Sequence, residues 1–310
     1  MFRMGIRSQS GVMKYLLFML VAGCVAEAKG VAAPAPKVHQ IQANEAGLLV
    51  NGYLVEGAHG VVAVDSALTI TDARRLRKAA DALGKPLLAV LITHGHPDHY
   101  NGVAALLSGR KVPVYATAPV AKVIRDDDAA KEKQWKPVFK DEWPAKRAFP
   151  DHEVKDGDKL TFDGMTFVAH ELGPAESHAD SCWELTGAER AAFIGDEVLN
   201  GAHAYTNDGH TAAWLANLDR LAKELAGVAH IYPGHGAAGD ASLLAWERTY
   251  LTTYRAEVDK LRGGADTLSD AQRATLVEHM KAAYPKAALE FMIALGANTV
   301  AAELAHDHGR

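Results

Sequence analysis

One short polar segment constrains this chain more than any other part of it. His94, His96, Asp98 and His99 fall within six residues, directly after the apolar run of residues 86–92. A short apolar run that ends at a turn is typical of a buried strand, and the helical spacing of the apolar residues that follow predicts a helix behind it. The four polar side chains are therefore expected on a loop between a strand and a helix.

These four residue types indicate a metal centre. In an extended loop His94 and His96 point to the same side and can bind one metal, while Asp98 and His99 can reach a second. Neutral imidazole together with carboxylate suits zinc best, with iron, manganese and cobalt as alternatives. So many ligand-type residues at this spacing are not typical of an ordinary solvated loop. We therefore expect two metal ions, with two Zn²⁺ as the first choice.

The segment also carries a family resemblance. The run Thr93-His94-Gly95-His96-Pro97-Asp98-His99 resembles the His-X-His-X-Asp-His signature of the metallo-β-lactamase superfamily, and the resemblance covers residues 45–240. It implies an α/β fold in the form of a four-layer αββα sandwich, with the site at the strand ends between the two sheets. Strand patterns in two groups, each accompanied by helical patterns, agree with that expectation.

The third ligand of the first metal is expected on the turn-rich loop of residues 172–181. His178 is the natural third imidazole there, and the ligand order of the superfamily favours it. His170 is a rival by proximity, but its place on the preceding strand favours a structural role. This loop departs from the Gly-His-Ser-rich version usual in the superfamily, so that Glu176 or Asp180 could contribute polar groups near the metals.

Two further positions complete the ligand sets. Asp196 ends the buried-strand pattern of residues 191–196, and a carboxylate held at a strand end can bridge two cations about 3.5–4 Å apart. His235 lies in a Pro-Gly-His-Gly turn after the last strand pattern. The resemblance also implies that Asp65 supports the metal loop from behind, although a strand-end aspartate is also a common cap residue. The expected sets are His94, His96 and His178 for the first metal, Asp98, His99 and His235 for the second, with Asp196 shared.

This ligand set predicts hydrolysis. Two dications lower the pKa of a shared water from about 15.7 towards 7, which makes hydroxide available for attack on a carbonyl at neutral pH. Asp98 can orient that hydroxide, so Asp98 and Asp196 are the expected catalytic residues. Tyr205, His203 and His210 lie on a loop beside the expected pocket and are candidate substrate contacts, with ordinary loop packing as an equal alternative for each.

Several functions fit this centre. The preferred one is hydrolysis of an ester, lactone, thioester or cyclic amide, because Asp196 matches glyoxalase II-like thioesterases and lactonases. Zinc β-lactamases usually carry cysteine or serine at that point, yet β-lactam hydrolysis suits an exported protein. Two other classes are an iron protein that resembles persulfide dioxygenases, which use only the first ligand set, and a non-catalytic metal-binding lipoprotein.

The N-terminus predicts export. Arg3, Arg7 and Lys14 precede the apolar run of residues 15–21, which is too short to span a bilayer of roughly 30 Å and reads as a secretory signal. The run ends in Val-Ala-Gly-Cys, which resembles a bacterial lipoprotein box and would make Cys24 the lipidated residue. Ordinary signal cleavage a few residues later is the alternative. Either route leads to the periplasm or to a lipoprotein anchored in the outer membrane.

The remaining patterns define domains and partners. We expect a signal peptide at 1–23, a tether at 24–44, the metal-binding domain at 45–240 and a helical extension packed on it at 241–310. The extension reads as three helices, 241–261, 269–283 and 285–305, which could cover the body, cap the pocket or form a homo-oligomer face. A formal charge of −5 without a basic stripe argues against nucleic acid. A small-molecule substrate is the expected partner, with membrane contact only through the lipid anchor.

Two smaller features remain. Trp135, Phe139 and Trp143 are spaced by four in a charged segment, which favours a helical insertion packed on the body over a lining of the substrate entrance. Cys182 lies on a strand-like run and is expected to be buried and inert.

Overall fold

The computed structural model describes residues 1, 35–187 and 189–308. The predicted signal peptide from residue 2 onward and the predicted lipidation site at Cys24 lie outside the described residues. Within the described ranges, each helix is too short or too polar to cross a bilayer.

The first sheet contains six strands in sequential order. The first three strands pair antiparallel and the later ones pair parallel. The sheet starts before the predicted domain boundary at residue 45, because part of the predicted tether forms its edge strand. The strands are β1 (Lys37–Gln42), β2 (Asn51–Glu56), β3 (Val61–Val64), β4 (Leu87–Leu91), β5 (Val114–Thr117) and β6 (His152–Val154).

The second sheet contains five strands in the order β11-β10-β9-β8-β7. Its strands pair antiparallel except for β10 and β11, which run parallel. The bounds are β7 (Lys159–Phe162), β8 (Met165–Gly173), β9 (Asp180–Thr186), β10 (Ala191–Leu199) and β11 (His230–His235).

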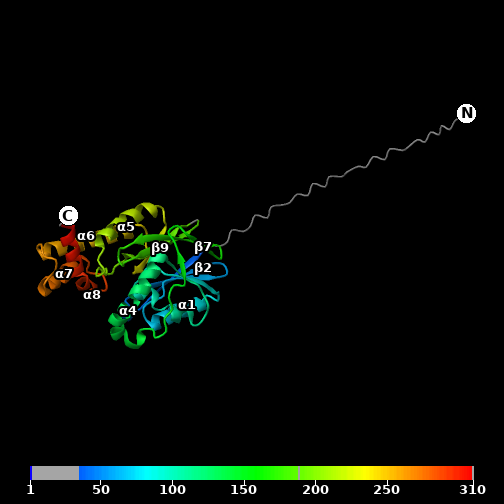
Figure 1. Ribbon diagram of the computed structural model, residues 1–310, viewed down its shortest axis with the longest axis horizontal. Coiled ribbons are helices and arrows are strands. Elements are labelled where there is room, and N and C mark those ends of the chain that lie inside the picture. Colours follow the sequence, from blue (N-terminus) through cyan, green and yellow to red (C-terminus); the bar gives the residue numbers. More distant parts are fainter. Residues whose placement is uncertain (2–34, 188, 309–310) are drawn as a thin grey trace. The chain divides into compact units, whose positions relative to one another are not determined.

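Helices cover the outer face of each sheet (Figure 1). The first sheet is covered by α1 (Ile70–Ala82), α2 (Pro97–Tyr100), α3 (Val103–Leu107) and α4 (Ala118–Phe139). The second is covered by α5 (Thr211–Glu224) and α6 (Ser242–Arg262). The remaining helices pack against α6 and one another: α7 (Asp270–Ala283), α8 (Phe291–Leu295) and α9 (Ala297–His308). Two single-turn helices, η1 (Glu45–Gly47) and η2 (Lys140–Glu142), complete the described elements.

Alternating side chains build the layers, as successive residues of a strand point to opposite faces. In β2, Tyr53 and Val55 belong to the core between the two sheets, whereas Leu54 belongs to the core under the first group of helices. Phe167 and Phe193 of the second sheet fill the same inter-sheet core. The fold is thus the αββα sandwich that the sequence predicts, with a C-terminal group of helices.

The C-terminal extension differs from its prediction in one respect. A single helix is expected over residues 285–305, but the chain forms the two shorter helices α8 and α9, which meet at Gly296. A side-chain carbon at Gly296 would overlap Thr206 Oγ1, so this glycine allows the extension to approach the loop after β10.

Candidate metal centre

The polar segment after β4 folds as the sequence predicts. β4 ends at Leu91. Pro97 occupies the first turn of α2, where backbone N–H groups have no acceptor within the helix, so the missing N–H of proline costs no hydrogen bond. His94 and His96 lie on the loop, while Asp98 and His99 lie in α2. All four side chains are buried.

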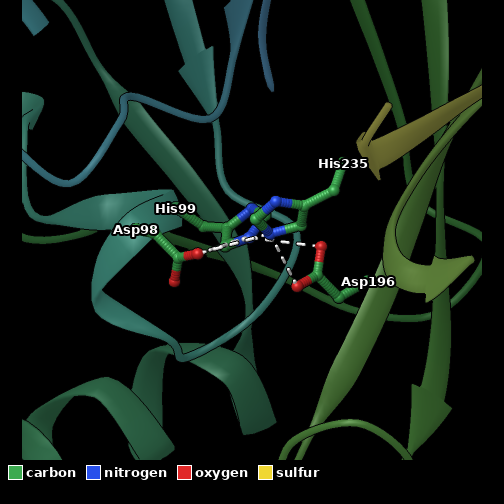
Figure 2. Close-up of side chains that lie close together, drawn as sticks. All are labelled: Asp98, His99, Asp196 and His235. Carbon is green, nitrogen blue, oxygen red and sulfur yellow. Dashed lines mark ion pairs between the residues drawn. The ribbon is translucent and has the colours of Figure 1, made fainter. Parts of the chain in front are cut away.

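One cluster joins this segment to the second sheet. Figure 2 shows the imidazoles of His99 and His235 and the carboxylates of Asp98 and Asp196 facing one another. His235 Nε2 lies 3.4 Å from Asp98 Oδ2 and 3.3 Å from Asp196 Oδ2. Asp196 Oδ1 lies 3.4 Å from His99 Nε2. Gly234 permits this approach of β11 to β10, because a side-chain carbon there would overlap Asp196 Oδ1.

The other cluster contains His94, His96 and Glu176; it corresponds to the expected first metal and is called the first cluster. Glu176 Oε2 lies 3.3 Å from His94 Nε2 and 2.7 Å from His96 Nδ1. The two clusters are adjacent, since the ring centroids of His94 and His99 are 4.0 Å apart. Together they place six of the seven sequence-predicted ligands around one centre.

His178 is the predicted ligand that the structure does not bring to the centre. Its side chain is exposed, and its Nδ1 lies 2.9 Å from Nε2 of His210. The loop turns tightly here, because Ser177 N–H donates to Asp180 Oδ2 at 2.9 Å. This turn directs Glu176 inward and His178 outward, so the carboxylate occupies the place at which the sequence predicts an imidazole.

Neighbouring side chains fix the orientation of the imidazoles. Asp65 accepts a hydrogen bond from His99 Nδ1 at 2.8 Å and another from the Thr93 hydroxyl at 2.9 Å. The Thr93 oxygen is then free to accept from His94 Nδ1, 3.1 Å away. Both histidines therefore turn Nε2, with its lone pair, toward the clusters. Asp65 thus contacts the metal loop from behind, which is the position that the resemblance implies for it.

His96 is oriented by a residue that the sequence does not single out. Its Nε2 donates to Asp208 Oδ2 at 2.9 Å, which leaves Nδ1 to face Glu176. Asp208 also accepts from the Tyr205 hydroxyl at 3.3 Å and lies 3.6 Å from Lys131 Nζ. An aspartate in a polar loop has no local signal that could have indicated this contact, because the partners are distant in sequence.

The donor atoms fit bound cations. His94 Nε2, His99 Nε2, Glu176 Oε2 and Asp196 Oδ1 are buried without a hydrogen-bond partner among the described residues. Such atoms are costly unless something binds them. Each is a lone-pair donor of the kind that zinc and related metals coordinate.

The electrostatics of the clusters also favour positive charge. Burial lowers the pKa of His235, but the Asp196 and Asp98 carboxylates outweigh it and raise the pKa to about 10. Burial raises the pKa of Glu176 to about 7, against the attraction of His96. Buried carboxylates in this number require either protons or metal ions to balance them.

A pocket opens beside the clusters and encloses about 530 Å³, including space open to solvent. His203 and Tyr205, both candidate substrate contacts, line it, whereas His210 is not among its lining residues. His203 is buried, and its Nδ1 lies 3.0 Å from the Tyr250 hydroxyl of α6. Trp135 and Phe139 line the pocket and Trp143 is buried, so the aromatic series serves both as packing and as pocket wall.

Two other histidines and the cysteine are not part of either cluster. His170 pairs with Glu184 at 3.1 Å, and His230 is exposed. Cys182 is fully buried, which raises the pKa of its thiol and leaves it no nucleophilic role.

Comparison with known proteins agrees with this centre. Residues 46–235 match the model of the metallo-beta-lactamase superfamily, so the chain belongs to that superfamily. A hydroxyacylglutathione hydrolase from Cupriavidus taiwanensis is 25% identical over 211 residues, which cover 63% of this chain and 70% of that protein. A second hydroxyacylglutathione hydrolase, from Albidiferax ferrireducens, is 28% identical over 155 residues, covering 49% of this chain and 50% of its own.

Among solved structures, a metallo-beta-lactamase family protein from Thermus thermophilus superposes with a TM-score of 0.62 at 20% identity, covering 88% of this chain and 94% of its own. At that identity the likeness shows the fold alone. The family and the named relatives indicate a hydrolase, and the two clusters are compatible with a dinuclear metal site.

Proposed function

We propose that the chain is a dinuclear metal-dependent hydrolase that cleaves a carbonyl ester, lactone, thioester or cyclic amide. The single observation that carries the proposal is the adjacency of two ligand clusters that share a wall of one open pocket. Zinc is the metal that we propose, since its usual donors are imidazole and carboxylate.

Two bound cations would supply Lewis acidity, which polarises a carbonyl and lowers the pKa of water. The residues of the chain then have distinct tasks. Asp196 belongs to the cluster of Asp98, His99 and His235, with one carboxylate oxygen toward each histidine, and would hold an ion there. We propose that the same carboxylate is shared with the ion of the neighbouring cluster. Asp98 lines the pocket and can hold a proton of the attacking water or return one to the leaving group.

Tyr205 and His203 complete the polar part of the pocket. Tyr205 donates to Asp208 and packs its ring 5.1 Å from that of His96, so its hydroxyl is fixed beside the first cluster. His203 Nε2 is buried without a hydrogen-bond partner among the described residues. His203 Nε2 can therefore contact a bound carbonyl compound, while the Tyr205 ring lines the pocket beside His96.

Export belongs to the same proposal. Its support is the basic and apolar pattern of residues 3–21, and lipidation at Cys24 would anchor the enzyme to a membrane.

The test is a hydrolysis panel of esters, lactones, thioesters and β-lactams on zinc-reconstituted protein. We expect Asp196→Ala to lower kcat by at least about a hundredfold, because it removes the shared carboxylate. Asp219→Ala, which removes an exposed carboxylate on α5, should leave the rate unchanged. An unaffected rate in Asp196→Ala would contradict the dinuclear mechanism.

A second candidate is an iron-dependent oxidoreductase. The set His94, His96 and Glu176 is a two-histidine, one-carboxylate combination, which is the usual set of non-haem iron oxygenases. Such chemistry uses one metal and leaves the four donors of the other cluster without a task, so hydrolysis is preferred. Purified protein that is colourless and contains zinc would discard the iron candidate.

A further inference from the structure

The pocket lining is mostly apolar beyond the candidate metal ligands. Apart from the cluster residues, its polar lining consists of Lys131, His203 and Tyr205. The rest of the lining is apolar, from Leu48, Leu68, Pro97, Trp135, Phe139, Leu199, Leu289 and Met292. A surface of this kind favours hydrocarbon over charged groups.

One apolar wall comes from α4. Trp135 and Phe139 are one helical turn apart and therefore share a face, with their ring centroids 6.2 Å apart. Both side chains are half-buried, whereas Val138 between them in sequence is 62% exposed. The helix thus presents an aromatic face to the pocket and a different face to solvent.

A second apolar wall comes from the C-terminal extension. Leu289 and Met292 line the pocket, while Phe291 beside them is 48% exposed. The backbone of this segment is pinned to the loop after β10, because Ala288 N–H donates to Gly201 O at 2.9 Å and accepts at its own oxygen from His203 N–H at 2.8 Å. Leu289 follows with φ of 63°, a conformation that leucine rarely adopts and that the surrounding bonds must hold.

The charges of the pocket oppose an anionic substrate tail. Among the described residues that line the pocket, Lys131 is the one lysine or arginine, and it already lies 3.6 Å from Asp208. Its ammonium also lies over the Tyr205 ring, 5.6 Å from the centroid. The carboxylates of a glutathione moiety would therefore find no unshared cation on these walls.

We infer that the substrate carries an uncharged hydrocarbon chain next to its reacting carbonyl, and that this chain lies between the α4 wall and the Leu289–Met292 wall. The inference rests on the proposed hydrolase function. It also distinguishes this protein from its hydroxyacylglutathione hydrolase relatives, whose named substrate carries a charged peptide.

The experiment compares p-nitrophenyl acetate, hexanoate and decanoate with S-lactoylglutathione on the zinc-loaded enzyme. We expect kcat/KM to rise about two- to fourfold per added methylene between acetate and hexanoate, because each methylene buried in an apolar pocket stabilises the bound state by a factor of this size. S-lactoylglutathione should be a poorer substrate than the hexanoate by about a hundredfold or more. A flat ester series, or a preference for S-lactoylglutathione, would overturn the inference while leaving hydrolysis itself intact. Absence of hydrolysis of every compound would instead overturn the proposed function.

Four variants test where the hydrocarbon chain of the substrate binds. Phe139→Ala and Met292→Ala should each lower the ratio of hexanoate to acetate kcat/KM by about tenfold. The matched controls are their exposed neighbours, Val138→Ala and Phe291→Ala, which should keep the wild-type ratio. Phe139 is only half-buried, so its variant remains a valid test even if Met292→Ala does not fold. An equal fall in all four variants, or in none, would contradict the assigned walls.

Discussion

Asp208 determines which nitrogen of His96 faces the centre. It accepts from Nε2 at 2.9 Å, and its side chain is only 9% exposed, so little water competes for the bond. A carboxylate in this position fixes the ring and makes the opposite nitrogen more basic.

We therefore predict that Asp208→Ala weakens metal binding at the first cluster by about 10–100-fold. Competition with a chromophoric chelator measures this loss. Asn207→Ala removes the exposed neighbour on the same loop and should bind metal as the wild type does. Equal affinities in Asp208→Ala and the wild type would show that His96 needs no such support.

The remaining residues of the centre show what sequence can and cannot predict. His94, His96, Asp98 and His99 are close in sequence, so a local pattern indicates them directly. Asp196 and His235 can be predicted because each lies at the end of a strand pattern, and the expected fold brings these strand ends together at the site. The third position of the first cluster depends on how one loop turns.

That turn separates Glu176 from His178. The sequence indicates Glu176 only as a polar group near the metals, and the ligand order of the superfamily favours His178. In the structure, the hydrogen bond from Ser177 N–H to Asp180 turns the loop so that Glu176 and not His178 faces the centre. A hydrogen bond of this kind has no recognisable pattern in a single sequence.

At the scale of elements, the strands and most helices follow from apolar periodicity. The exceptions depend on the segment against which an element packs. The predicted helix over 285–305 divides at Gly296 because it packs against Thr206, and the edge strand β1 forms because β2 offers it a partner.

Glu247 shows the same dependence on packing between elements. It lies on α6, is fully buried, and accepts from the backbone N–H of Leu199 at the end of β10 at 2.9 Å. Burial raises the pKa of its carboxyl well above the usual range, and the carboxylates of Asp196 and Glu176 contribute to the rise. The folded chain therefore holds a proton here that the unfolded chain releases above about pH 4.3.

The unfolding free energy should consequently fall as pH rises from about 4.3 toward the folded-state pKa, by at most about 1.4 kcal/mol per pH unit from this group. Glu247→Gln keeps an acceptor for Leu199 but cannot ionise, so its stability relative to the wild type should increase between pH 5 and pH 8. Urea unfolding across that range measures the difference. Glu278→Gln, an exposed site on α7, should run parallel to the wild type. A constant difference between Glu247→Gln and the wild type would contradict a buried protonated Glu247.

At the scale of the whole domain, the centre lies where the two sheets meet. The first sheet supplies the segment after β4, and the second supplies Glu176, Asp196 and His235 from three different strand ends or loops. The C-terminal extension adds part of the pocket wall. Neither half of the chain holds a complete set of donors for both ions.

The most direct test is the metal content of purified, zinc-loaded protein, measured by plasma mass spectrometry for the wild type, Glu176→Ala and His178→Ala. We predict two zinc ions per chain in the wild type and in His178→Ala, and about one in Glu176→Ala, because only Glu176 faces His94 and His96. Loss of an ion in His178→Ala with none lost in Glu176→Ala, or a wild type that binds no zinc, would contradict the dinuclear centre described above.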